Sequence, residues 1–176
     1  MKVKHVLFLV LFILIAVCIG GGYYYYVKNS YIQRADLPQY VQEKLIKYNS
    51  YNLELKKDYD IDDRHIMIFT FKQNGNNMLG YAVFKLMPNG KYKYDRFSSS
   101  NESTGYQTFL TENEQSPGEN KFYYVFYGII LDKQPNKFKV EVGGKEYIEE
   151  IERNTYFLKV YPIIKGSETS ITPMDN

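Results

Sequence analysis

The stretch KFYYVFYGIIL, from Lys121 to Leu131, decides the fold because both of its faces are apolar. Successive side chains of a β-strand point to opposite faces of the sheet, so the stretch presents two rows of apolar or aromatic side chains. One row is Phe122, Tyr124 and Phe126, and the other is Tyr123, Val125 and Tyr127. A strand that is apolar on both faces has to be covered on both sides. We therefore expect Lys121 to Leu131 to be a central strand.

Four segments before this strand alternate apolar with polar residues or are rich in β-branched and aromatic residues, which is typical of strands. They are residues 51–55, 65–72, 78–87 and 91–97. Turn-forming residues separate the last three, with Asn74 to Asn77 in the first connection and Pro88 to Gly90 in the second. The sequence therefore predicts successive antiparallel strands.

The chain after the central strand also reads as mainly extended. Residues 138–142 alternate apolar with charged side chains, and the two glycines at 143–144 permit the positive φ angles of a tight hairpin. Residues 145–153 carry apolar side chains at helical spacing too, but the adjoining glycine pair favours a strand. We expect a last strand over residues 156–164, followed by a loose polar tail over residues 166–176.

One amphipathic helix is expected over Leu37 to Tyr48, because apolar residues recur there at helical spacing. Asp36 is a suitable N-cap, and Pro38 suits the first helical turn. Gly80 and Ala82 would leave a shallow strand surface on which the helix could lie. The expected fold class is therefore α+β, with one helix packed on a mainly antiparallel sheet. An all-β sandwich with the helix at its edge is the alternative.

The N-terminal residues have the composition of a membrane anchor. Val6 to Ile19 contains no polar side chain, and the uncharged residues up to Val27 lengthen the segment to about 33 Å at roughly 1.5 Å per residue. That length exceeds the hydrocarbon core of about 30 Å, and Lys2 and Lys4 orient the N-terminus toward the cytoplasm. We expect a transmembrane helix that contacts the membrane through residues 6–27. A secretory signal peptide is the alternative.

These features divide the chain into four parts. Residues 1–27 form the expected N-terminal anchor or uncleaved signal, and residues 28–35 form a linker. Residues 36–165 form one mainly-β domain, and residues 166–176 form the tail. The expected location is the cell membrane, crossed once, with the domain on the extracellular side.

Charge and cysteine content exclude several classes of function. The chain has 22 basic and 20 acidic residues, so Lys2 and Lys4 account for its whole net charge of +2. A domain without net charge offers no electrostatic case for nucleic-acid binding. The single cysteine, Cys18, excludes an intrachain disulfide and a thiolate zinc site. No phosphate-binding glycine loop is found, and we expect no cofactor.

The densest group of possible metal ligands is Asp58, Asp60, Asp62 and Asp63. Oxygen-rich loops of this kind can hold Ca²⁺, but an EF-hand would need glycine where Asp63 stands. A solvated turn is the favoured interpretation, and we expect no bound metal. His65 could form a hydrogen bond with Asp62 or Asp63, although a half-buried structural histidine is favoured. No catalytic residue is assigned.

The 19 tyrosines include candidates for a binding surface. An exposed tyrosine makes low-entropy contacts and could stack on a glycan or line a groove for an extended peptide. The candidates are Tyr92, Tyr94, Tyr106, Tyr123 and Tyr127. Core packing is the favoured role for most of these side chains.

Three segments carry a resemblance to a known group of proteins: residues 127–130 (YGII), 138–142 (FKVEV) and 156–158 (YFL). They resemble strand pairs that recur in small single-pass cell-envelope proteins of low-G+C Gram-positive bacteria. The resemblance implies an envelope location, and it carries no catalytic residue over to this chain.

The favoured function is a non-catalytic, membrane-tethered binding or protein-interaction domain. Its expected partner is an envelope protein or a cell-wall component. One alternative is a carboxylate-dependent envelope hydrolase, for which Glu146 and Glu149 belong to the acidic residues that could be paired. Another is an accessory or immunity protein of a neighbouring secretion system.

Overall fold

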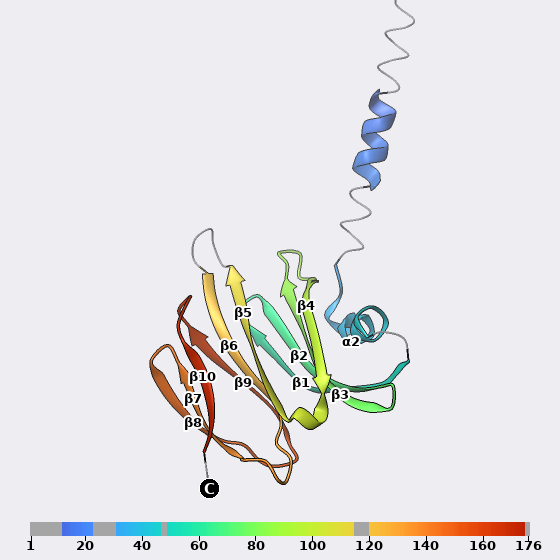
Figure 1. Ribbon diagram of the computed structural model, residues 1–176. Helices are drawn as coiled ribbons and strands as arrows, with labels where there is room; N and C mark the ends of the chain where they lie inside the picture. Colours follow the sequence, from blue (N-terminus) through green and yellow to red (C-terminus); the bar gives the residue numbers. More distant parts are fainter. Residues whose placement is uncertain (1–11, 23–30, 47–48, 115–119, 175–176) are drawn as a thin grey trace, which may run out of the picture.

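The computed structural model describes residues 12–22, 31–46, 49–114 and 120–174. These residues contain ten strands in three antiparallel sheets (Figure 1). The first sheet has the order β1 (Ser50–Ile61), β2 (Arg64–Gln73), β3 (Asn76–Leu86) and β4 (Tyr92–Asn101). The second has the order β5 (Tyr106–Glu114), β6 (Asn120–Ile129) and β9 (Tyr156–Ile163). The third has the order β10 (Thr169–Met174), β7 (Lys137–Val142) and β8 (Lys145–Glu150).

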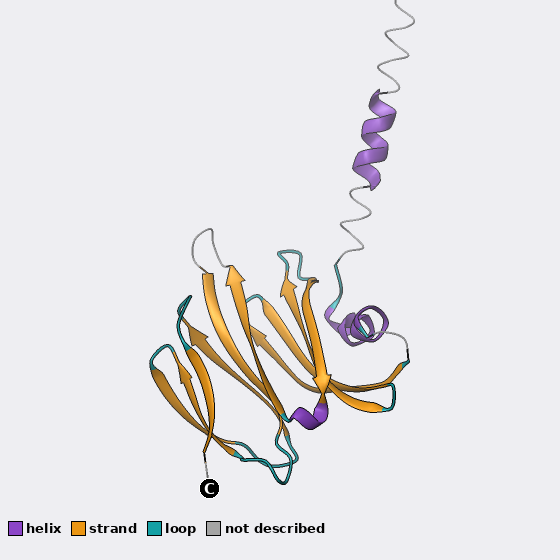
Figure 2. Cartoon of the chain, in the orientation of Figure 1, coloured by secondary structure: helices purple, strands orange, loops and turns teal. Residues whose placement is uncertain are grey.

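The three sheets are stacked, and a helical segment covers the outer face of the first sheet (Figure 2). The first core lies between this segment and the first sheet, the second core between the first and second sheets, and the third core between the second and third sheets. Alternation along β2 explains the arrangement, because Met67 and Phe69 face the first core while Ile66 and Ile68 face the second. Strand β2 is therefore buried on both faces along most of its length.

The prediction of a central strand with two buried faces is confirmed by β6. This strand pairs with β5 on one side and with β9 on the other. Val125 and Tyr127 are buried in the second core, and Tyr124 and Phe126 are buried in the third. Strand β6 is thus the middle strand of the middle sheet.

The predicted α+β class is wrong, and the all-β alternative fits the structure better. Apart from the helix over residues 12–22, the helices are short turns, and the described residues otherwise form mainly three antiparallel sheets. The physical reason lies in the second half of the chain. A single helix cannot cover both apolar faces of the β5–β6–β9 sheet, so the first and third sheets cover them instead.

The helical segment is shorter and less regular than the predicted helix over Leu37 to Tyr48. It consists of η1 (Arg34–Asp36), α2 (Leu37–Tyr40) and the π-type turn η2 (Val41–Leu45). Residues 47 and 48 lie outside the described residues. Leu37 and Val41 are buried against the first sheet in the core that also contains Ala82, as predicted. Gly80 has a different role, because a Cβ atom there would lie 2.8 Å from the ring of Phe69.

The tight turns agree with the sequence, whereas the C-terminal tail does not. Asn74 and Gly75 have φ angles of 51° and 82°, and Gly143 and Gly144 have φ angles of 56° and 77°. These positive angles suit two-residue hairpins. Residues 166–176 were expected to be loose, but β10 lies within them and pairs with β7 along its whole length. The apolar side chain of Ile171 packs on the third core, which explains the pairing.

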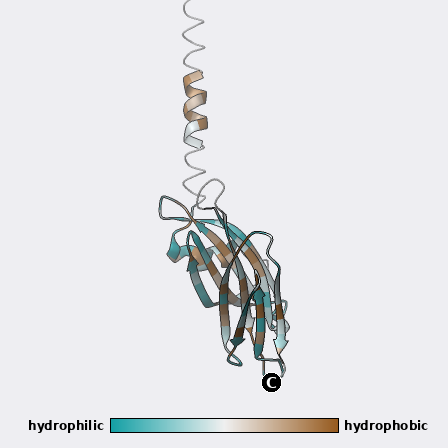
Figure 3. Ribbon diagram, turned by 90° about the vertical axis from the view of Figure 1, so that its left-hand side faces the viewer, coloured by the Kyte–Doolittle hydropathy of each residue, from teal (hydrophilic) through white to brown (hydrophobic). Residues whose placement is uncertain are grey.

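The expected transmembrane helix over residues 6–27 is not supported. Residues 12–22 form a helix with exposed apolar side chains (Figure 3), while residues 6–11 and 23–27 lie outside the described residues. Within the described part of the chain, no helix is both long enough and apolar enough to cross a membrane.

Candidate functional site

The four candidate metal-binding aspartates of the β1–β2 hairpin point in different directions. Asp60 pairs with His65 in the antiparallel register, and Asp58 and Asp60 both lie beside Arg34 of the helical segment. Asp62 and Asp63 stand at the turn and contact other partners. Among the described residues, no group of three or more histidine, cysteine, aspartate or glutamate side chains could hold a metal ion.

Asp60 links the helical segment to the first sheet. Arg34 Nη2 donates to Asp60 Oδ2 at 2.8 Å, and His65 Nδ1 lies 2.6 Å from Asp60 Oδ1. Burial raises the pKa of Asp60, but hydrogen bonds from His65 and Arg34 together outweigh burial and leave the pKa lowered. His65 therefore contacts Asp60 and not Asp62 or Asp63, the two partners that the sequence allowed. Register decides the matter, since Asp60 lies directly across the hairpin from His65.

We predict that the Asp60 link weakens at low pH. Its folded-state pKa is lowered, so its stabilisation is present above the unfolded-state pKa of about 3.9 and is lost as the pH falls through the folded value. Asp60→Asn should lower the thermal midpoint by a few degrees at pH 6, and the difference from wild type should shrink toward pH 2. Asp36→Asn, at an exposed position, is the control. A difference that is equal at both pH values would contradict the prediction.

Asp62 belongs to a polar seam between the first and second sheets, whereas Asp63 pairs with Arg64 and Lys85 of the first sheet. Tyr123 donates a short hydrogen bond to Asp62 Oδ2, and Lys121 Nζ lies 3.7 Å from the same oxygen. The hydrogen bond from Tyr123 is the largest contribution to the lowered pKa of Asp62, and burial raises the pKa of Tyr123 to about 12. Both groups keep one protonation state near neutral pH, so the pair joins the sheets without exchanging a proton.

The polar seam also contains buried groups without partners. Thr111 and Asn113 are 1% and 0% exposed, and their side-chain polar atoms have no hydrogen-bond partner of good geometry within the described ranges. Asn113 still lies close enough to Asp62 to help lower the pKa of that carboxyl. Buried polar atoms of this kind are commonly satisfied by internal water.

The five candidate tyrosines do not form one exposed surface. Tyr92 and Tyr94 pack in the first core, Tyr123 and Tyr127 in the second, and Tyr106 in the third. Tyr127 is fully buried and donates to Gln107 Oε1 at 2.9 Å. The five candidate tyrosines are thus distributed over three different cores.

Two adjoining hollows lie where the β2–β3 hairpin, β1, η3 (Glu102–Thr104) and β9 meet. Their volumes are about 220 Å³ and 500 Å³, and Asn77 and Glu102 line both of them. We call the two hollows together the Glu102 groove. The smaller one is lined by Asn52, Glu54, Lys56 and Tyr156 among others, and the larger one by Asn76, Asn101, Ile129 and Leu131 among others.

The groove walls are held by contacts between separate elements. Tyr156 of β9 donates a short hydrogen bond to Glu102 Oε1, and Lys56 Nζ lies 5.0 Å from the centre of the Tyr156 ring. Burial, followed by the hydrogen bond to Glu102, raises the pKa of Tyr156. Lys56 also donates to Glu54 Oε2 at 2.5 Å and thereby lowers the pKa of Glu54. These contacts therefore preorganise the groove.

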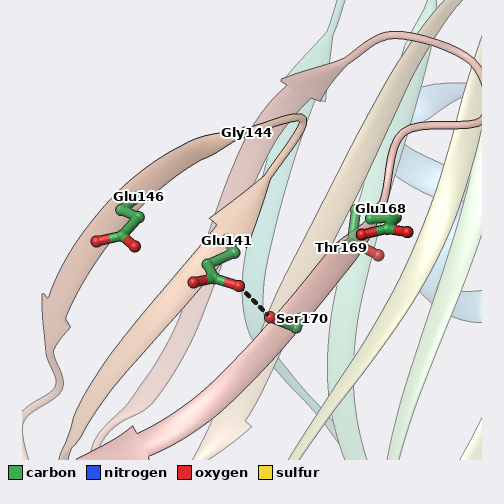
Figure 4. A pocket seen from close by; sticks show the side chains of 6 residues that line it. All are labelled: Glu141, Gly144, Glu146, Glu168, Thr169 and Ser170. Carbon is green, nitrogen blue, oxygen red and sulfur yellow. Dashed lines mark hydrogen bonds between the residues drawn. The ribbon is translucent and has the colours of Figure 1, made fainter.

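A separate, acidic hollow of about 560 Å³ lies between the β7–β8 hairpin and β10 (Figure 4). Glu141, Glu146 and Glu168 line it, and Ser170 donates to Glu141 Oε2 at 3.1 Å. Lys139 Nζ lies 2.5 Å from Glu141 and 3.3 Å from Glu146. The hydrogen bond from Lys139 lowers the pKa of Glu141, so this carboxyl is a poor general acid.

Sequence reasoning missed the Glu102 groove. Its residues come from six separate parts of the chain, and each looked like an ordinary strand or turn residue. The local signal in the sequence is the concentration of asparagine over residues 74–77, which is equally typical of a turn. Strand pairing is required to bring these residues together.

Comparison of the chain with protein-family models, with curated proteins and with solved structures finds no match.

Proposed function

We propose that the protein is a non-catalytic binding domain and that the Glu102 groove is its ligand site. The observation that carries the proposal is a concave surface whose hydrogen-bonding side chains converge from β1, β3, η3 and β9. The larger hollow, at about 500 Å³, falls within the roughly 300–1,000 Å³ typical of small-molecule sites. An envelope protein or a cell-wall component remains the partner within this proposal.

The charges of the candidate sites support binding rather than hydrolysis. Glycoside hydrolysis needs one carboxyl group with a raised pKa to act as the acid. The pKa values of Glu54, Asp60, Asp62 and Glu141 are all lowered, by hydrogen bonds from neighbouring side chains. Carboxylates of this kind accept hydrogen bonds from a ligand and do not protonate a leaving group.

The proposal predicts ligand-induced changes confined to the groove. The full chain, labelled with ¹⁵N, is titrated separately with tri-N-acetylchitotriose, tetra-alanine, spermine and inorganic phosphate. At least one probe should shift the amide signals of Asn77, Glu102 and Tyr156 and should be recovered intact by mass spectrometry. Absence of shifts at these residues with all four probes and with maltotriose would contradict the groove as the site, and cleavage of a probe would contradict the non-catalytic assignment.

A further inference from the structure

We infer that the Glu102 groove takes a neutral, polyhydroxylated ligand, in chemical terms a short oligosaccharide of uncharged sugars. This inference rests on the proposed function, and it names the class of ligand. A sugar hydroxyl donates one hydrogen bond and accepts others, so a sugar needs a wall that offers both donors and acceptors at close spacing. The described lining of the groove has that composition.

The first observation is charge balance. Two cations, Lys56 and Lys72, and two carboxylates, Glu54 and Glu102, line the smaller hollow. One of these cations is already paired, since Lys56 donates to Glu54. A phosphate or a carboxylate ligand would need an excess of cations, and a polyamine would need an excess of carboxylates. With no excess of either among its described lining residues, the groove favours an uncharged ligand.

The second observation is the supply of amide groups. Asn52, Asn76 and Asn77 are exposed, and none of their side chains forms a hydrogen bond with another described residue. Each amide offers an acceptor oxygen and two donor hydrogens to a ligand. Asn101 differs, because its Oδ1 accepts from Ser103 N at 2.9 Å and from Ser103 Oγ at 2.7 Å and so holds η3 in place.

The third observation concerns Glu102, which stands between the two hollows. Its Oε1 accepts the hydroxyl of Tyr156, which fixes the carboxylate, and its Oε2 has no hydrogen-bond partner within the described part of the chain. A fixed carboxylate oxygen is a strong acceptor for a ligand hydroxyl. Because Glu102 lines both hollows, it can contact two consecutive sugar units.

The fourth observation is an apolar border in the larger hollow. Ile129 and Leu131 form this border. A sugar ring presents C–H groups as well as hydroxyl groups, and the C–H groups gain from removal of water beside an apolar side chain. A small polar ion has no such surface. The border therefore favours a ring-shaped ligand over inorganic phosphate.

The test is titration of the full chain with tri-N-acetylchitotriose and with maltotriose, followed by ¹⁵N–¹H NMR. We expect at least one of these neutral sugars to bind with a millimolar or tighter Kd and to shift the amides of Asn77 and Glu102. Asn77→Ala removes an exposed amide and should weaken binding about fivefold, as expected for one lost neutral hydrogen bond. Glu102→Gln should weaken it about tenfold or more, because a charged acceptor is lost.

Asn89→Ala is the matched control, since Asn89 lies in the β3–β4 turn at the opposite end of the first sheet. Its Kd should equal that of the wild type. If neither sugar binds while tetra-alanine, spermine or phosphate shifts the groove amides, the sugar assignment is overturned and the proposed function stands. If no probe shifts the groove amides, both are overturned. Sugar binding that is unaffected by Asn77→Ala and by Glu102→Gln would also overturn the inference.

Discussion

Phe126→Ala is expected to lower the free energy of unfolding by about 3–5 kcal/mol, the range found when a buried phenylalanine is truncated. Phe126 is fully buried on β6, in the core between the second and third sheets. Its ring centre lies 5.4 Å from that of Phe138 and 4.7 Å from that of Phe157, both in edge-to-face geometry. Truncation removes these contacts and leaves a cavity that neighbouring strands cannot fill.

The measurement is urea unfolding of the full chain followed by circular dichroism. Leu110→Ala is the control, because Leu110 lies on the adjacent strand β5 but is 50% exposed. The control should change the free energy of unfolding by less than about 0.5 kcal/mol. Equal effects of Phe126→Ala and Leu110→Ala would mean that the third sheet does not cover β6.

Gly128→Ala is expected to cost about 1–3 kcal/mol more than Gly75→Ala, the usual range for overpacking. A Cβ atom at Gly128 would lie 2.6 Å from Tyr106 Cα and in severe contact with the carbonyl oxygen of Gly105. Both are backbone atoms at the start of the neighbouring strand β5, so no side-chain rotation can relieve the clash. The β5–β6 pairing itself would have to shift.

Gly75 provides the comparison because it isolates backbone conformation. It has a φ angle of 82°, and a Cβ atom there would have no neighbour within 4 Å. Gly75→Ala should therefore lower the free energy of unfolding by only about 1 kcal/mol, the cost of a left-handed backbone conformation for alanine. Thermal and urea unfolding of both variants test the difference. A Gly128→Ala variant as stable as Gly75→Ala would contradict the close packing of β5 on β6.

Local patterns predicted the strands and turns well because their physical causes are local. The two apolar rows of Lys121 to Leu131 required cover on both sides, and the structure provides it. The pair Gly143-Gly144 implied a hairpin, and both residues have positive φ angles. The alternation over 138–142 matches the buried and half-buried pattern of β7.

Arrangements that depend on contacts between distant segments could not be predicted. The number of sheets follows from which strand covers each face of β6, and period-two alternation carries no information on that choice. Residues 166–176 contain too few apolar side chains to indicate a strand, yet β10 forms because β7 offers it a free edge. The helical segment from Leu37 ends at Leu45, because Ile46 has an extended conformation and is buried in the first core.

The candidate site shows the same division between local and distant information. In the densest carboxylate cluster, Asp60 contacts Arg34 and His65 and so forms a structural link. The groove is instead built from ordinary polar residues, such as Asn77 and Glu102, that lie far apart in the sequence. A high local density of acidic residues was therefore a poor guide to the concave site.

The most direct measurement on the binding proposal blocks the groove covalently. In a Cys18→Ser background, Asn77→Cys and Asn89→Cys are each labelled with a bulky maleimide, and binding of tri-N-acetylchitotriose, tetra-alanine, spermine and phosphate is measured by titration calorimetry. Every probe that binds the unlabelled protein should lose binding when residue 77 is labelled and keep it when residue 89 is labelled. Retained binding with residue 77 labelled would contradict the assignment of the Glu102 groove as the ligand site.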